Sequence, residues 1–217
     1  AHPVELNANI KALLAQSKVR KTEPVNKGYV LGVIAAKGGL GVSTVALNLA
    51  ISFARTTKKK VIAMETRPGQ STWRNEMGFA DASGLDNLLA KNLGEINQNA
   101  VKEQLTPNNF GVPLLLASNN VYDFTAFTAV DQYEVILENL SALADLVVVD
   151  IGTNFHPAYE VFTRLCNEII VITEPQPLSL RHTRLLIADL KRRNFGSAKL
   201  LNIIMVNRVR ADISFSV

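Results

Sequence analysis

Short apolar runs bounded by turn residues alternate along this chain with longer stretches in which apolar residues recur every three or four positions. The short runs are rich in β-branched residues, which is typical of buried strands. The longer stretches have the period of helices that bury one face. The predicted strands cover residues 29–35, 61–65, 113–117, 146–150, 168–173 and 200–206, and the predicted helices cover residues 43–55, 133–143, 158–165 and 178–193.

The predicted strands are apolar on both faces, which is expected for a sheet with helices on both sides. The alternation of strand and helix predicts an α/β fold with a doubly wound, mostly parallel sheet flanked by helices. With 217 residues and 47% hydrophobic content, the chain is long enough for one main domain with its own core. The segment QLTPNNFG at 104–111 is predicted to be a loop.

The first 28 residues differ in character from the rest. Residues 4–14 place their apolar side chains near one helical face, and residues 17–27 are polar and basic like a linker. Two interpretations stay open. The helix docks on this same domain, or HPVELNANIKALLAQ resembles the closing helix of a response-regulator receiver domain, in which case this chain is a piece of a longer protein. We therefore divide the chain into a helix and linker at 1–28 and a main domain at 29–217.

Composition adds an expectation about location. No apolar run approaches the roughly 18 residues that a membrane-spanning helix needs, and the N-terminus lacks the layout of a secretory signal. The single cysteine, Cys166, cannot form an internal disulfide. These features predict a cytoplasmic protein without an integral membrane segment. The net charge of +4 is modest and scattered, so it favours an acidic partner only weakly.

The strongest functional signal is AAKGGLGVST at 35–44, which follows a predicted strand and opens a predicted helix. Glycines allow backbone conformations that bring main-chain N–H groups close to an anion, and the helix N-terminus adds partial positive charge. Ser43 is expected where a hydroxyl ligates Mg²⁺, and Thr44 is expected to contact phosphate. We predict a site for ATP and Mg²⁺ built from Gly38, Gly39, Leu40, Gly41, Val42, Ser43 and Thr44.

The loop departs from the ordinary P-loop at the position before Ser43, where a lysine is expected and Val42 stands. Lys37 matches the extra signature lysine of the deviant KGGxGK[ST][ST] pattern, and on this pattern the chain resembles the ParA/MinD family of P-loop NTPases of the SIMIBI type. The resemblance implies that Lys37 reaches across a dimer to the partner's nucleotide and acts catalytically in trans. It also implies a homodimer that depends on nucleotide.

A second departure comes after the next predicted strand. The ParA/MinD family usually has Asp-x-Asp-Pro-Gln there, whereas residues 64–70 are METRPGQ. Glu65 preserves the first acid of this switch region, but the second, which in the family helps to place the attacking water, is replaced by Arg67. Arginine is always cationic and cannot act as a base at neutral pH, which leaves a phosphate contact as its alternative role. We therefore predict slow or absent hydrolysis.

Trp73 and Phe79 are expected to pack in the core.

Two further elements agree better with the family. Residues 146–150 (LVVVD) have the layout of a Walker B strand, in which Asp150 holds Mg²⁺ through its water shell and takes part in catalysis. Residues 203–209 (IIMVNRV) resemble the family's late strand followed by Asn-Arg. That resemblance implies that Asn207, with Arg208 beside it, binds the adenine.

The resemblance is closest to the CpaE/TadZ branch, whose members have a small residue in place of the P-loop lysine. It is carried also by ALNLA at 46–50, GLDNLL at 84–89 and LLAS at 115–118. The resemblance implies a receiver-like domain before the ATPase-like domain and further helices after residue 217. It also implies a factor that is recruited to a cell pole or the inner membrane face and acts with pilus-assembly or polar-localisation proteins in type IV (Flp, tight-adherence) pilus assembly.

Three functions stay open at this stage: a nucleotide-dependent dimerising scaffold, an active ParA-type ATPase for DNA or cargo partitioning, and a nucleotide-free pseudo-ATPase that serves as an interaction module. The basic triplets at 58–60 and 191–193 lie at or just after the C-terminal end of a predicted helix, where solvated cations are favourable, so DNA is not expected as a partner. His2, His156 and His182 lack metal-ligand spacing, so no metal site other than the Mg²⁺ site is predicted.

Overall fold

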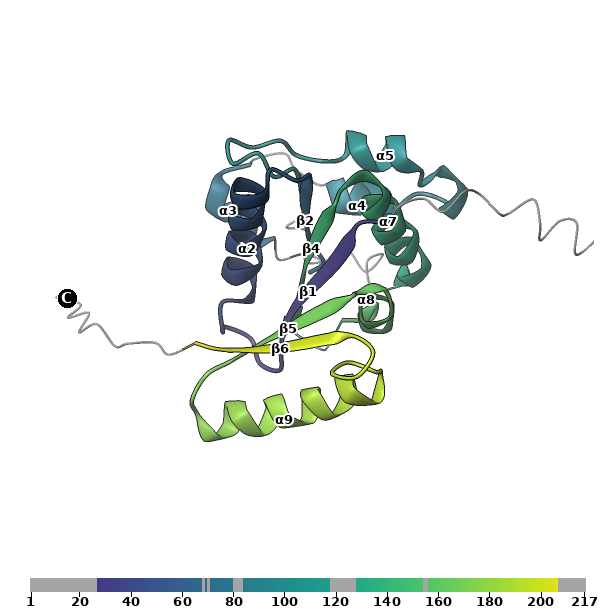
Figure 1. The fold of residues 1–217 in the computed structure, drawn as a ribbon. Coiled ribbons are helices and arrows are strands. Elements are labelled where there is room, and N and C mark those ends of the chain that lie inside the picture. Colours follow the sequence, from purple (N-terminus) through teal and green to yellow (C-terminus); the bar gives the residue numbers. More distant parts are fainter. Residues whose placement is uncertain are drawn as a thin grey trace, which may run out of the picture.

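A six-stranded parallel sheet forms the centre of the molecule (Figure 1). The computed structural model describes residues 27–67, 69, 71–79, 84–117, 128–153 and 156–206. The strand order is β3-β2-β4-β1-β5-β6, so after β4 the chain crosses to the other side of β1. Such a reversal opens a crevice at the carboxyl ends of the strands. The strands are β1 (Tyr29–Ala35), β2 (Val61–Glu65), β3 (Leu114–Leu115), β4 (Leu146–Thr153), β5 (Glu168–Thr173) and β6 (Leu200–Met205).

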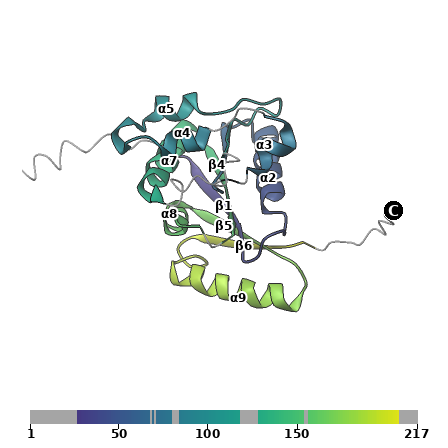
Figure 2. The same ribbon diagram turned by 180° about the vertical axis from the view of Figure 1, so that it is seen from behind.

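Helices cover the sheet from both sides, as Figure 1 and the view from behind in Figure 2 show. On one side lie α2 (Val42–Thr57) and α3 (Thr72–Met77). On the other lie α4 (Gly84–Leu89), α5 (Gln98–Glu103), α7 (Val130–Leu143), α8 (Tyr159–Leu165) and α9 (Pro177–Arg192), with the short 3₁₀ helix η1 (Leu93–Glu95).

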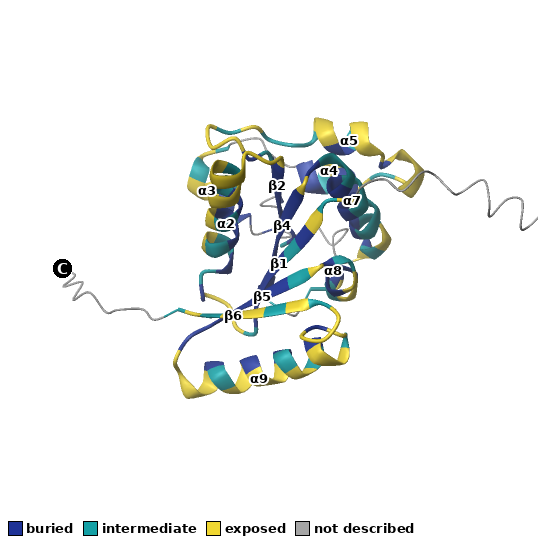
Figure 3. Cartoon of the chain, viewed as in Figure 1, coloured by how far each residue is buried: buried dark blue, intermediate teal, exposed yellow. Residues whose placement is uncertain are grey.

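The core consists of two layers, one on each face of the sheet (Figure 3). In β1, Val30 and Ile34 pack toward α7 and α8, whereas Val33 and Ala35 pack toward α2. Side chains of a strand alternate between faces, so an uninterrupted apolar run fills both layers. This arrangement explains why these strands are continuous apolar segments in the sequence.

The predicted fold class is confirmed, and the main differences concern element boundaries. Strand β4 continues past Asp150 to Thr153, because Gly152 and Thr153 pair with the end of β1 after a register shift. Strand β3 has two residues instead of the five predicted at 113–117. The segment 104–111 is a loop, but it includes an antiparallel bridge in which Thr106 and Leu114 exchange main-chain hydrogen bonds.

Three helices of six residues each, α3, α4 and α5, were not predicted from the sequence. Six residues make fewer than two turns, too short for a helical period to be recognised. The predictions for residues 1–26, including the receiver-like helix, and for Asn207 and Arg208 fall outside the described residues. Among the helices that the structure describes, none is both long enough and apolar enough to cross a bilayer.

Candidate phosphate site

The predicted phosphate loop lines a cavity at the carboxyl end of the sheet. The cavity has a volume of about 320 Å³. It is bounded by the loop between β1 and α2, by the residues after β2 and by the end of β4. The lining residues are Lys37, Gly38, Gly39, Gly41, Val42, Ser43, Thr44, Arg67, Thr72, Gly152 and Thr153.

The glycines give the cavity a floor of exposed main chain. Gly39 and Gly41 have φ of 76° and 84°, values at which other residues are strained. A Cβ added at Gly38, Gly39 or Gly41 would meet no other atom within 4 Å, so the space above the loop is open. Gly41 also starts α2 without a side-chain cap, which leaves the first N–H groups of that helix for an anion. The geometry fits a phosphate cradle.

Two members of the predicted loop contribute differently from the glycines. Leu40 is 3% exposed and packs in the core beside α2, so only its main chain can take part in binding. Val42 is 8% exposed and packs in the same apolar layer. The position of the usual P-loop lysine is therefore a core position in this chain.

Asp150 and Ser43 meet at the inner end of the cradle. Asp150 is 2% exposed and shares a hydrogen bond with the Ser43 side chain. The Gly152 N–H donates to Asp150 Oδ1 at 3.0 Å. Burial raises the pKa of Asp150, while the Ser43 and Gly152 hydrogen bonds and the charge of Arg67 act in the opposite direction. A buried carboxylate beside a hydroxyl is a donor set that suits Mg²⁺.

Lys37 is part of the cavity wall, but its ammonium group has a partner within the chain. Its Nζ donates to Glu174 Oε1 at 2.9 Å, at the end of β5. The side chain of Lys37 is 43% exposed, and that of Glu174 is 8% exposed. Ser179, in the first turn of α9, also donates to this carboxylate, at 2.7 Å. In this structure the signature lysine therefore binds a buried acid.

Glu65 belongs to the predicted switch region, yet its carboxylate binds the N-terminal end of α3. It accepts hydrogen bonds from the Ser71 hydroxyl at 2.5 Å and from the Thr72 and Trp73 N–H groups at 2.7 and 2.8 Å. Glu65 is 3% exposed, and burial raises its pKa against these lowering hydrogen bonds. Glu65 thus satisfies the first N–H groups of a helix, and it does not line the cavity.

Arg67, the second member of the predicted switch region, lines the same cavity as the glycines of the loop. The stem of its side chain lies over Gly152, where a Cβ would come within 2.8 Å of Arg67 Cδ. Its charge acts on Asp150. The structure therefore brings Lys37, Ser43 and Arg67 together around one cavity. Asp150 lies behind this lining, hydrogen-bonded to Ser43, and Glu65 is bound to α3.

Sequence reasoning missed two contacts that hold this region together. Trp73 is fully buried, as expected, but its indole Nε1–H also donates to the Ser43 carbonyl at 3.0 Å. His156 Nδ1 accepts from the Ala158 N–H at 3.0 Å, so the proton lies on Nε2, which donates to the Thr66 carbonyl at 2.7 Å. These pairs are distant in the sequence, and no local pattern indicates them.

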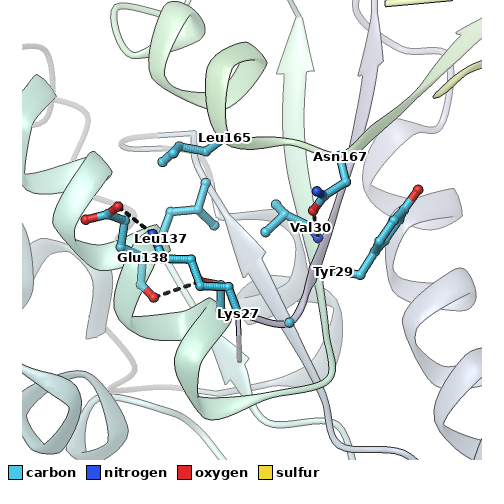
Figure 4. Close-up of a pocket in the computed structure, with 9 residues that line it drawn as sticks. Lys27, Tyr29, Val30, Leu137, Glu138, Leu165 and Asn167 are labelled. Atoms are coloured by element: carbon cyan, nitrogen blue, oxygen red, sulfur yellow. Dashed lines mark hydrogen bonds and ion pairs between the residues drawn. The ribbon is translucent and has the colours of Figure 1, made fainter. Parts of the chain in front are cut away.

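A second cavity, of about 280 Å³, lies at the other end of β1 (Figure 4). Lys27 Nζ donates to Glu138 Oε1 at 2.8 Å, and the Val30 N–H donates to Asn167 Oδ1 at 2.8 Å. These polar groups are thus engaged within the fold. None of the predicted site residues lines this cavity.

The sheet topology and the glycine cradle at its crossover point define the class of fold. It is an α/β fold of the P-loop NTPase type, the fold of the ParA and MinD ATPases. No family model matches the sequence, and a search of curated proteins gives no significant match.

Solved structures match the fold at low sequence identity. A ParA family ATPase from Chlorobium tepidum has a TM-score of 0.65 at 16% identity, over 82% of this chain and 73% of that protein. The cell division ATPase MinD of Pyrococcus furiosus has a TM-score of 0.63 at 19% identity, over 81% and 69%. Cobyrinic acid a,c-diamide synthase from Mycobacterium smegmatis, solved with an ATP analogue and magnesium, has a TM-score of 0.64 at 16% identity, over 82% and 74%.

Proposed function

We propose that this chain is an ATP-binding scaffold that dimerises when nucleotide is bound, and that it hydrolyses ATP slowly or not at all. The observation that carries the proposal is the open glycine cradle ending at Ser43 and the buried Asp150. Main-chain N–H groups at a helix N-terminus bind phosphate, and Ser43 and Asp150 would hold Mg²⁺, the latter through water. A Mg²⁺ ion bound there would offset phosphate charge.

Slow hydrolysis is expected from the side chains around the cradle. Turnover needs a group that orients or activates the attacking water. Of the described residues that line the cavity, none carries a carboxylate, because Arg67 occupies the position of the family's second acid. The carboxylate of Glu65 already accepts hydrogen bonds from Ser71 and from the first N–H groups of α3. Binding can therefore persist while the chemical step is slow.

Dimerisation would use Lys37. Its side chain lines the cavity, is partly exposed and is bound to Glu174. An ammonium group gains more from the charges of a triphosphate than from one carboxylate, so a second subunit that presents nucleotide can compete for it. Association would then depend on ATP, since only the nucleotide-loaded partner offers the competing charge.

The cellular role rests on the sequence resemblance to the CpaE/TadZ branch. We propose a cytoplasmic factor for type IV (Flp, tight-adherence) pilus assembly, recruited to a cell pole or the inner membrane face. The receiver-like tail at 1–28 and an adenine contact by Asn207 and Arg208 belong to the same proposal. Deleting the gene in its host should abolish surface pili, and unchanged piliation would contradict this role.

Two competing functions make different predictions. An active ParA-type ATPase would be retained on DNA in a salt-sensitive manner and would hydrolyse ATP. Lys58, Lys59 and Lys60 are exposed beyond α2, and Lys191 and Arg192 are exposed at the end of α9, whereas Arg193 is bound to Asp189 and Glu160. A pseudo-ATPase interaction module would bind no nucleotide.

The decisive experiment combines calorimetry of Mg²⁺·ATP binding with light scattering, on the wild type, on Lys37→Ala and on the control Lys59→Ala. The proposal expects micromolar ATP binding and an ATP-dependent dimer that Lys37→Ala abolishes and Lys59→Ala preserves. No binding at millimolar ATP would favour the interaction module. Rapid hydrolysis by the wild type would contradict the slow chemical step.

A further inference from the structure

The cradle lacks the cation that a P-loop ordinarily supplies. Position 42 is a valine packed in the core, and Lys37 is bound to Glu174. A triphosphate brings several negative charges into a small volume, and main-chain N–H groups offset them only in part. Among the described residues that line the cavity, the cationic ones are Lys37 and Arg67.

Arg67 reaches the cavity from the end of β2, which β4 separates from β1 in the sheet. It leaves the chain two residues after β2 and shares the cavity with Ser43, Thr44 and the glycines. Its stem crosses Gly152, whose φ is 72° and whose missing Cβ leaves the room: an added Cβ would lie 2.8 Å from Arg67 Cδ and 3.1 Å from Cγ. Its charge acts on Asp150, the acid at the inner end of the cradle.

The base of this side chain is fixed by its neighbour Thr66. The Thr66 N–H and hydroxyl both donate to the Asp150 carbonyl, at 3.2 and 2.8 Å. The Thr66 carbonyl accepts from His156 Nε2 at 2.7 Å and from the Tyr133 hydroxyl at 3.3 Å. Four hydrogen bonds thus hold the main chain where Arg67 begins. A side chain that leaves a fixed backbone loses less conformational freedom when it binds.

We propose that Arg67 is the phosphate-binding cation within each subunit, and that from the end of β2 it replaces the lysine that is absent at position 42. The inference rests on the proposed function, because it assumes that a nucleoside triphosphate occupies the cradle. A guanidinium presents a planar fork of donors that can bind two phosphate oxygens at once. Because it keeps its proton at neutral pH, it strengthens binding without serving as a base.

The test measures binding of ATP, ADP and AMP with Mg²⁺, by calorimetry and by fluorescence of Trp73. Trp73 is the sole tryptophan and touches the Ser43 carbonyl, so its emission reports on the loop. Arg67→Met keeps the stem over Gly152 and removes the charge, and Arg67→Gln is a second variant. Arg184→Gln, on the exposed side of α9, is the control with the same charge change.

Loss of a charge-assisted contact should weaken ATP binding about tenfold or more in Arg67→Met, with little change for AMP and none in Arg184→Gln. Adding Val42→Lys to Arg67→Met should restore part of the ATP affinity. ATP affinity within about twofold of the wild type, or equal losses for AMP and ATP, would overturn the assignment of Arg67 alone. A wild type that binds no ATP would overturn it together with the proposed function.

Discussion

Glu65, the last residue of β2, and Asp150 in β4 are register partners, and both are almost completely buried. Their roles differ because the chain continues differently after the two acids. After β2 the chain turns into α3, whose first N–H groups converge on Glu65. In β4 the strand continues past Asp150, the Gly152 N–H donates to its carboxylate, and Asp150 shares a hydrogen bond with Ser43 at the cradle. Two acids at equivalent places in a sheet thus become a structural anchor and a candidate Mg²⁺ ligand.

The largest expected effect on stability is at Glu65, the acid that binds the N-terminus of α3. Glu65→Ala should lower the free energy of unfolding by about 3 kcal/mol, because it leaves the buried donors of α3 without their acceptor. Chemical denaturation followed by Trp73 fluorescence measures this loss. Glu76→Ala, on the exposed face of α3, is the matched control and should change stability by less than about 0.5 kcal/mol. Equal stability of the two variants would refute the structural role of Glu65.

The next largest effect on stability is expected at His156. Its Nε2 donates to the Thr66 carbonyl after β2, and the Thr66 hydroxyl donates to the Asp150 carbonyl in β4. Burial lowers the pKa of His156 from 6.5 to about 4. As pH falls below 6.5, the unfolded chain takes up this proton before the folded chain does, so the contribution is complete above pH 6.5 and is lost toward pH 4. Between about pH 7 and pH 5 the free energy of unfolding should fall by about 2 kcal/mol from this residue.

The raised pKa values of Glu65 and Asp150 act on stability in the opposite direction as pH falls, so a matched variant is needed. His156→Gln removes the titration and keeps a donor for Thr66. The difference between the pH profiles of wild type and variant isolates the imidazole. Parallel profiles would show that His156 is not held neutral in the fold.

The smallest effect on stability is expected at Asp150. Asp150→Asn should change the free energy of unfolding by less than about 1 kcal/mol, because burial already disfavours the charged form and an amide oxygen can still accept from Gly152. The same substitution should remove the dependence of ATP binding on Mg²⁺, which calorimetry with and without the ion measures. A loss of stability as large as that of Glu65→Ala would erase the contrast between the two acids.

The parts of the fold that the sequence predicted correctly depend on local information. The bounds of β1, β2 and β5 match the prediction because these strands are continuous apolar runs with turn residues at both ends. The short helices α3, α4 and α5 were missed because they are held by tertiary contacts. In α3 those contacts are Trp73 in the core and Glu65 beneath the first turn.

In the candidate site, too, some features have a local sequence signal and others depend on tertiary contacts. The sequence by itself identified the glycine loop, Ser43 and Asp150, since glycines between a strand and a helix, and an acid at a strand end, have local signatures. It marked Val42 and Arg67 as departures without saying how they are related. Only the tertiary structure decided that Lys37 binds Glu174, that Glu65 belongs to α3 and that Arg67 shares the cavity with Ser43. The reason is physical: the contacts of Lys37 and Arg67 join segments that follow different parallel strands, and the order of the strands is set by packing of the whole sheet. The contact of Glu65 forms only when the chain after β2 turns back as α3.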